Sequence, residues 1–238
     1  AVLISWKKFV AMDRITRIVL SLSPVINPAW RKRLWHEKER FLKKIDQATE
    51  IKKINKLVQE TEQIIQNFPR IPPGNYVKVM LVGEIYVVLE PAVNFNLEEQ
   101  LSMMGVFVER TIYFSKWIRD QLLCSFLRID WQKKLRKLAN PYLTHFIGGH
   151  GLESVAHAVC AAKNNFDGVI QLAPLGCMPE VTAMSVLQQI SKEKSISILS
   201  LLIDEHTAGA GVTTRLEAFV DLLRNKKFSG KKNMARCI

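Results

Sequence analysis

The N-terminal part of the chain carries apolar side chains at helical spacing. Apolar positions within residues 15–22 recur three and four apart, which places them on one face of a helix. Two proline-containing segments interrupt this pattern at 23–28, and it resumes over residues 30–68, long enough for one bent helix or two helices. A proline-rich stretch at 69–74 then stops the helix. The pattern predicts a helical lobe and a linker over residues 1–74.

Beyond residue 74, short apolar runs alternate with segments of helical periodicity. The runs that we expect as strands are 77–82, 106–112, 169–173 and 196–203, and residues 85–89 are compatible with an extension of the first. The helices that we expect are 97–104, 117–138, 152–163, 180–193 and 213–225. Strands separated by helices predict an α/β fold, with a parallel sheet of about four strands, an order such as 2-1-3-4, and helices on both faces.

The change of pattern divides the chain into three parts. We expect a helical lobe with its linker over 1–74, an α/β domain over 75–226 and a basic tail over 227–238. The chain does not begin with Met. We therefore interpret the lobe as a remnant of, or a connection to, an N-terminal domain that is missing here.

Composition supports a packed protein without a membrane span. Hydrophobic residues make up 48% of the 238 residues, which is ample for a core. No apolar stretch reaches the roughly 18 residues that a membrane helix needs. Lys7-Lys8 follows the apolar opening, which is the reverse of signal-peptide order. We expect a cytoplasmic protein.

The net charge of +12 is concentrated in two segments. Residues 30–56 hold ten Lys and Arg against four acids, and residues 224–236 hold six without an acid. Such segments can meet nucleic acid, an anionic membrane or a polyphosphate. Neither segment carries a helix-turn-helix or RRM signature. We interpret them as a solvated helix face and a loose tail, and we expect neither nucleic acid nor membrane as a partner.

One cysteine stands at a position suited to chemistry. The apolar run 169–173 is of strand type, Pro174 and Gly176 end it, and Pro179 suits the first turn of a helix. Cys177 is therefore expected at the carboxyl end of a strand and beside a helix N-terminus. Backbone N–H groups and the helix dipole favour a thiolate there, the form that binds metal or attacks electrophiles. The alternative is a small buried residue at a tight turn.

The other cysteines give no local metal signature. Cys124, Cys160 and Cys237 form no CxxC pair with each other or with Cys177, so spacing alone predicts neither a zinc site nor a disulfide framework. If Cys177 binds metal, the other ligands come from distant parts of the sequence or from a segment outside it.

Two acids follow apolar strands in the same way as Cys177. Glu84 follows the first strand and Glu205 the fourth. Ligands of parallel sheets bind outside the carboxyl ends of the strands, so we expect both acids and Cys177 on one edge. The alternative is that the acids are helix caps or loop anchors.

Two further motifs precede predicted helices. Gly148-Gly149-His150-Gly151 is a plausible anion cradle, since small residues let backbone N–H groups approach a phosphate, although a tight turn explains it as well. Thr214-Arg215-Leu216-Glu217 fits a capping box. It would leave Arg215 near the strand ends, able to bind a carboxylate or hold Glu205. His157 is interpreted as structural.

Several short sequence motifs together resemble those of a known family. They are Gly83-Glu84-Ile85-Tyr86-Val87, Gly149-His150-Gly151, Asp167-Gly168-Val169-Ile170, Cys177-Met178-Pro179-Glu180, Asp204-Glu205-His206-Thr207 and Thr214-Arg215-Leu216-Glu217-Ala218-Phe219. Over residues 75–225 the chain resembles the CoA enzyme activase-like branch of the 2-hydroxyacyl-CoA dehydratase and benzoyl-CoA reductase superfamily. The resemblance implies a flavodoxin-like or Rossmann-like domain and a [4Fe–4S] cluster held by cysteine thiolates from two domains.

The resemblance also implies roles for the candidate residues. Cys177 would be a cluster ligand, and Gly149 and Gly151 would contribute to the cofactor site. The catalytic candidates are Glu84, His150, Glu205 and Arg215. An ATP-dependent activator or another electron donor, an acyl-CoA ligand and a homo- or heterodimer would be the partners. The alternative from another class is a non-catalytic nucleotide- or phosphate-binding module with a structural cysteine.

Overall fold

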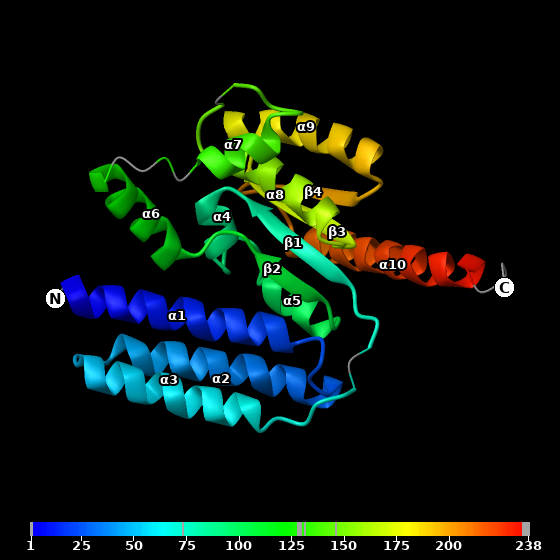
Figure 1. Ribbon diagram of the computed structural model, residues 1–238. Coiled ribbons are helices and arrows are strands. Elements are labelled where there is room, and N and C mark those ends of the chain that lie inside the picture. The colour runs from blue at the N-terminus through cyan, green and yellow to red at the C-terminus, as the bar shows by residue number, and fades with distance from the viewer. Residues whose placement is uncertain (1, 73, 128–129, 131, 146, 235–238) are drawn as a thin grey trace.

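In the computed structural model, a parallel four-stranded sheet lies between two helical layers, and a lobe of three long helices packs beside it (Figure 1). The structure describes residues 2–72, 74–127, 130, 132–145 and 147–234. The predicted α/β class with a preceding helical lobe is confirmed. Among the described helices, none is both long and apolar enough to cross a membrane.

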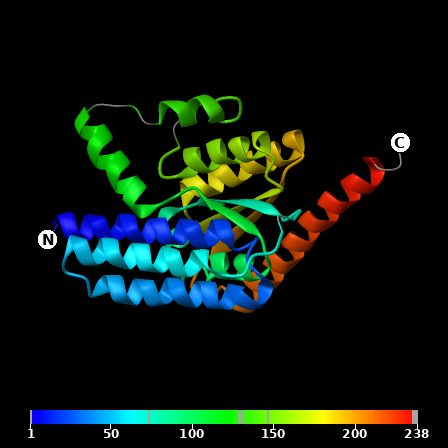
Figure 2. The same cartoon turned by 60° about the horizontal axis from the view of Figure 1, so that its bottom comes forward.

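The lobe consists of α1 (Val2–Leu22), α2 (Pro28–Asp46) and α3 (Ile51–Gln66), which lie side by side in Figures 1 and 2. The stretch 30–68 thus forms two helices. The start of α2 follows from local chemistry, because the Asn27 side chain accepts a hydrogen bond from the Ala29 N–H and Pro28 occupies the first turn. The linker is tied back to the lobe by backbone hydrogen bonds at both sides of an Ile26–Arg70 bridge.

The sheet consists of β1 (Lys78–Gly83), β2 (Phe107–Arg110), β3 (Gly168–Pro174) and β4 (Ser197–Ile203). Its order is β2-β1-β3-β4 and every pairing is parallel, as the sequence predicts. The carboxyl ends of all four strands therefore lie along one edge of the sheet.

The remaining helices correct several predicted boundaries. They are α4 (Ile85–Leu89), α5 (Leu97–Met103), α6 (Phe114–Leu127), α7 (Lys133–Ala139), α8 (Gly151–Lys163), α9 (Met178–Lys194) and α10 (Gly209–Met234). Residues 85–89 form a helix and not a strand extension, because the Glu84 carboxylate accepts from two N–H groups of its first turn. The expected helix over 117–138 is divided into α6 and α7.

The predicted capping box at Thr214 is wrong. Helix α10 begins at Gly209, and the Thr214 hydroxyl donates to the Ala210 carbonyl at 3.0 Å inside the helix. The same helix runs past residue 226 to Met234, and Lys227 binds Asp167 at 2.6 Å and the Tyr76 carbonyl at 2.7 Å. The predicted start of the tail at residue 227 is therefore too early, since the helix continues to Met234. Residues 235–238 lie outside the described residues.

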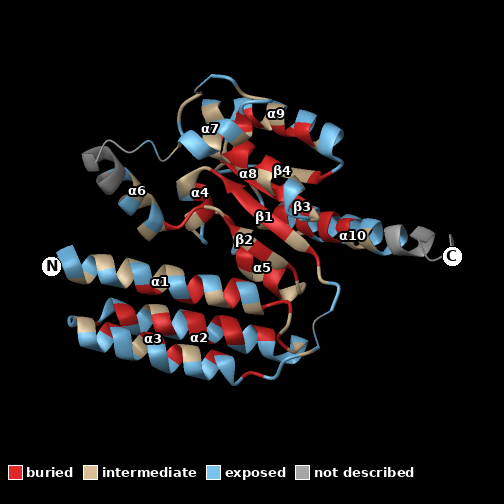
Figure 3. Cartoon of the chain, in the orientation of Figure 1, coloured by how far each residue is buried: buried red, intermediate tan, exposed pale blue. Residues whose placement is uncertain are grey.

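Two hydrophobic clusters fill the two faces of the sheet. One joins Val79, Leu81, Ile170 and Leu201 with α5, α10 and the lobe, and the other joins Val82 and Val169 with α7, α8 and α9. Figure 3 shows buried residues running from the strands into the inner faces of α1 and α2. The first of these clusters thus continues from the sheet into the lobe and holds the lobe on the α/β part of the chain.

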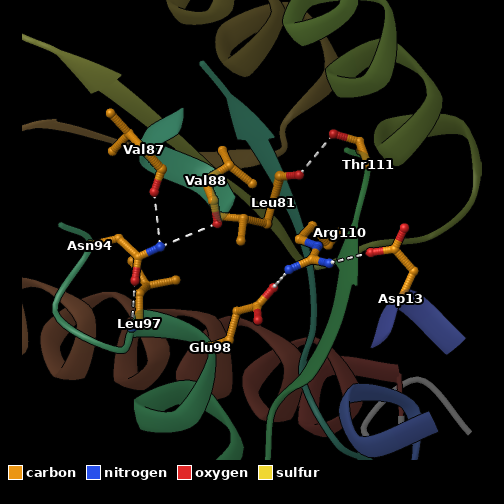
Figure 4. Close-up of polar contacts among 9 residues, drawn as sticks. All are labelled: Asp13, Leu81, Val87, Val88, Asn94, Leu97, Glu98, Arg110 and Thr111. Carbon is orange, nitrogen blue, oxygen red and sulfur yellow. Dashed lines mark hydrogen bonds and ion pairs between the residues drawn. The ribbon is translucent and has the colours of Figure 1, made fainter. Parts of the chain in front are cut away.

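Polar contacts also fix the lobe to the sheet (Figure 4). The buried Arg110 guanidinium at the end of β2 lies 3.1 Å from Glu98 of α5 and 3.7 Å from Asp13 of α1. The Trp35 indole of α2 donates to the Ser102 hydroxyl at 2.6 Å. Most lysines of α2 and α3 are exposed as expected from a solvated face, but Arg31 and Lys38 are buried.

Candidate functional site

The candidate site lies along the carboxyl edge of the sheet. Glu84 follows β1, Cys177 follows β3 and Glu205 follows β4. Since these three strands are parallel neighbours, the predicted placement of all three residues on one edge is confirmed. Which of them share chemistry depends on where each side chain lies.

Cys177 occupies the N-cap position of α9 and is half-buried. Its N–H donates to the Pro174 carbonyl at 3.1 Å and its carbonyl accepts from Val181 at 2.9 Å, so both backbone groups are used by the turn and the helix. The flanking side chains of Leu175 and Met178 are 64% and 71% exposed. The thiol therefore stands at a helix N-terminus within an exposed apolar surface.

Glu180, in the first turn after Cys177, is a site residue that the sequence reasoning missed. It is fully buried, and its carboxylate accepts from the Ser154 hydroxyl at 3.0 Å and from the Gln171 amide at 2.8 Å. Gln171 also donates to the Glu180 backbone carbonyl and accepts from Ser200 of β4. The available signal was Gln171 itself, since an amide inside an apolar strand needs buried partners.

Burial sets the electrostatics of Glu180. Desolvation raises the pKa of Glu180, and the hydrogen bonds from Gln171 and Ser154 oppose that shift. The Glu84 carboxylate, at the end of the neighbouring strand, raises the same pKa further. The carboxyl groups of Glu84, just after β1, and Glu180, in the first turn of α9, thus interact electrostatically.

Glu84 has a structural role that accounts for its position. Its carboxylate caps α4 by accepting from Tyr86 at 2.9 Å and Val87 at 3.1 Å. Gly83, just before it, has a φ of +141°, and a Cβ there would lie 1.9 Å from the Leu172 carbonyl oxygen. Only glycine lets β1 approach β3 so closely, which places the half-buried Glu84 at the strand end.

The glycine turn before α8 packs on the helix that begins at Cys177. A Cβ on Gly151 would lie 2.5 Å from the Pro179 carbonyl oxygen, and one on Gly149 would lie 3.2 Å from the Pro179 ring. Close packing therefore explains these glycines. His150 stands at the N-cap position of α8 without a side-chain capping bond, and burial lowers its pKa while Glu84 opposes the shift. The turn brings His150 within electrostatic range of Glu84.

Two predicted residues do not join this group. Glu205 has an 83% exposed side chain, 3.8 Å from His206. Arg215 donates to the Ser200 carbonyl at 2.8 Å, partway along the outer strand β4. Because α10 starts at Gly209, Arg215 lies in the second turn of this helix. Among the described residues it forms no ion pair with Glu205, so the expected hold on that acid is not present.

A second pair of titratable residues lies further along α8. Burial raises the pKa of Glu153 to about 7, with Lys116 opposing and Glu180 adding to the shift. Burial, followed by the Lys116 ammonium, lowers the pKa of His157 to about 4. Both residues line a cavity of about 170 Å³. Glu153 was not singled out from the sequence, and the interpretation of His157 as structural did not predict this cavity.

The cysteines of the described residues do not fit a complete iron–sulfur site. A [4Fe–4S] cluster requires four ligands, which are usually thiolates. Within the described part of the chain, no three His, Cys, Asp or Glu side chains gather in a metal-binding arrangement. Cys160 lies on α8, where its sulfur accepts from Asn164. The Cys124 side chain and Cys237 lie outside what the structure describes. Cys177 can therefore supply one ligand only.

Comparison with known proteins gives one match. The sequence profile of the family described as 2-hydroxyglutaryl-CoA dehydratase, D-component, matches residues 18–223. The match includes most of the lobe, the whole sheet and the turn that carries Cys177. A comparison with curated protein sequences finds no match.

Proposed function

The chain belongs to the 2-hydroxyglutaryl-CoA dehydratase D-component family, and we propose that it is a component of a 2-hydroxyacyl-CoA dehydratase-type enzyme system. The observation that carries this proposal is the place of Cys177, a half-buried thiol at the N-terminus of α9 on the carboxyl edge of the sheet. Within the superfamily, the phrases around Cys177, Glu84 and Glu205 favour the activase-like branch.

The proposed role of Cys177 is to supply one thiolate to a [4Fe–4S] cluster at an interface. A helix N-terminus stabilises a nearby anion by only about 0.3–1 kcal/mol at an exposed site, which is too little to assemble a cluster by itself. The other ligands must come from outside the described residues, either from another segment or from a second component. The exposed Leu175 and Met178 beside the thiol suit such an interface, since apolar side chains gain most from being covered.

The polar residues of the edge would then face the acyl-CoA. Glu84 and His150 are the inner candidates, because each is partly buried and lies within electrostatic range of the other. Glu205 is an outer candidate, exposed and free to meet an incoming ligand. Arg215 would first have to give up its hydrogen bond to Ser200, so it ranks last among the four.

The partners follow from the proposed system. A dehydratase component of this type requires an ATP-dependent activator or another electron donor, and a homo- or heterodimer would complete the cluster site. These partners would place the protein in the cytoplasm. An acyl-CoA dehydration assay of this chain together with its partner component decides whether the chain turns over an acyl-CoA or passes electrons to a second component.

Iron content tests the proposal. The full-length protein and its Cys177→Ser variant would be purified without oxygen, together with the partner component. We expect the wild type to hold iron and sulfide with visible absorption, and the variant to lose both. Cys160→Ser is the matched control, because this thiol is also half-buried but lies against Asn164 on α8. Equal iron in the Cys177 variant and the wild type would overturn the proposed ligand.

A further inference from the structure

A second site lies between the lobe and the edge strand β2. There a cleft of about 480 Å³ is bordered by α1, the end of β2, the start of α6 and α8. Strand β2 is the sheet edge opposite β4, and α1 lies beside β2 and the start of α6 in Figure 1. The lining residues used below are Trp6, Arg17, Arg110, Tyr113, Lys116 and His157. Three of these, Tyr113, Lys116 and His157, also line the cavity of about 170 Å³ that contains Glu153, so the two spaces adjoin.

The cleft has more positive than negative charge. Four cations line it, namely Arg17, Arg110, Lys116 and Arg119, against the single carboxyl group of Glu109. Burial raises the pKa of Glu109, which disfavours its negative charge, while Arg17 and Lys116 oppose that shift. The pKa of His157 is lowered to about 4, so this side chain is uncharged at neutral pH. The cleft is thus suited to an anion.

Two of the four cations are already neutralised. Arg110 is held by Glu98 and Asp13, as Figure 4 shows, and Arg119 lies 3.0 Å from Asp120. Arg17 and Lys116 are different, because neither forms an ion pair with any residue that the structure describes. Both are exposed at the cleft, where a ligand can reach them.

The walls of the cleft are built rather than incidental. The guanidinium groups of Arg17 and Arg110 lie 4.3 Å and 4.5 Å from the centre of the Tyr113 ring, which fixes their direction. Arg110 is 7% exposed, and its Nε atom is buried without a hydrogen-bond partner. Its guanidinium is held by Glu98 and Asp13, so Arg110 forms a fixed wall of the cleft and no direct ligand contact is assigned to it.

We propose that this cleft binds an organic phosphate of nucleotide size, with Arg17 and Lys116 on the phosphate groups and Trp6 against the planar ring. Arginine and lysine are the side chains that proteins use for phosphate, and aromatic side chains stack on bases. The volume falls within the range of about 300–1,000 Å³ typical of small-molecule sites. A free nucleotide and the nucleotide end of CoA share this chemistry. The inference does not depend on Cys177 or on a cluster.

Calorimetric titration of the full chain tests the proposal with three probes, ADP, CoA and inorganic pyrophosphate. We expect ADP or CoA to bind, with affinity falling as salt rises. Binding of CoA alone would identify CoA as the ligand. Binding of ADP with the same affinity as CoA would identify a free nucleotide. Pyrophosphate binding as tight as both would overturn the assignment of a planar ring. Absence of binding by all three would overturn the site.

Charge variants locate the binding. We expect Arg17→Gln and Lys116→Gln each to weaken the bound probe at least about ten-fold, because each removes a charged hydrogen bond. Lys44→Gln is the matched control, since Lys44 is an exposed lysine of α2 that does not line the cleft. Both cleft residues are exposed, so folding should be retained, and thermal unfolding checks it. Wild-type affinity in both cleft variants would place the ligand elsewhere and overturn the proposal.

Discussion

Gln171 and Glu180 are joined by two hydrogen bonds from a single amide group. Gln171 Nε2 donates to the Glu180 carboxylate at 2.8 Å and to the Glu180 backbone carbonyl at 2.9 Å, with both residues fully buried. The pair connects the middle of β3 to the first turn of α9, and Cys177 lies between them in the chain. The position of the thiol is therefore held by a polar contact inside the core.

Replacing Gln171 by Leu should destabilise the protein. The Glu180 carboxylate would lose its amide donor inside the core, at a cost of about 1–3 kcal/mol in the free energy of unfolding. Gln189→Leu is the control, because this exposed glutamine of α9 also donates to a carboxylate, that of Glu193 at 2.8 Å. Denaturant unfolding measures both. A loss in the Gln171 variant no larger than in the Gln189 variant would show that the buried pair is not stabilising.

Gly151→Ala should destabilise the protein as well, for a steric reason. The new Cβ would lie 2.5 Å from the Pro179 carbonyl oxygen, so the turn before α8 or the start of α9 must move, at a cost of about 1–3 kcal/mol. Gly211→Ala offers a matched comparison, because nothing lies within 4 Å of its Cβ position in α10. There the change should be neutral or raise the melting temperature, since alanine favours helix. Equal melting temperatures for the two variants would contradict the packing.

Stability should depend on pH through Glu153. Its pKa is about 7 in the folded protein, above the ordinary value of 4.5, so the folded state keeps a proton that the unfolded state releases between these values. The free energy of unfolding should therefore fall as pH rises from about 4.5 to 7, by on the order of 2–3 kcal/mol from this group. Glu153→Gln should remove that part of the slope, and Glu217→Gln, an exposed change on α10, should not. Unfolding curves at pH 5 and 7.5 decide between them.

Lys116→Gln should raise two pKa values at once. The Lys116 ammonium lowers the pKa of both Glu153 and His157, so its removal should shift both upwards. NMR titration of the His157 ring follows one of them, and the wild-type ring should stay neutral down to about pH 4. An unchanged His157 titration in the variant would mean that the Lys116 ammonium does not influence the cavity lined by Glu153 and His157.

The local sequence pattern was sufficient to predict the sheet order and the residues that follow its strands. Strand and helix periodicities predicted the parallel order β2-β1-β3-β4 and, with it, the common edge of Glu84, Cys177 and Glu205. Such inferences succeed because side-chain period, proline and glycine act over a few residues. The same reasoning failed at 85–89, where a short apolar run is equally compatible with strand and helix until the Glu84 cap decides.

Only the tertiary structure decided which side chains meet. Arg215 seemed close to Glu205 in sequence, but the early start of α10 turns it towards Ser200. Glu180 was not singled out from the sequence, and its burial against Gln171 and Ser154 makes it part of the core. The cleft between α1 and α6 joins residues about a hundred positions apart, such as Arg17 and Lys116. Desolvation and charge pairing depend on such distant neighbours, which local sequence pattern does not specify.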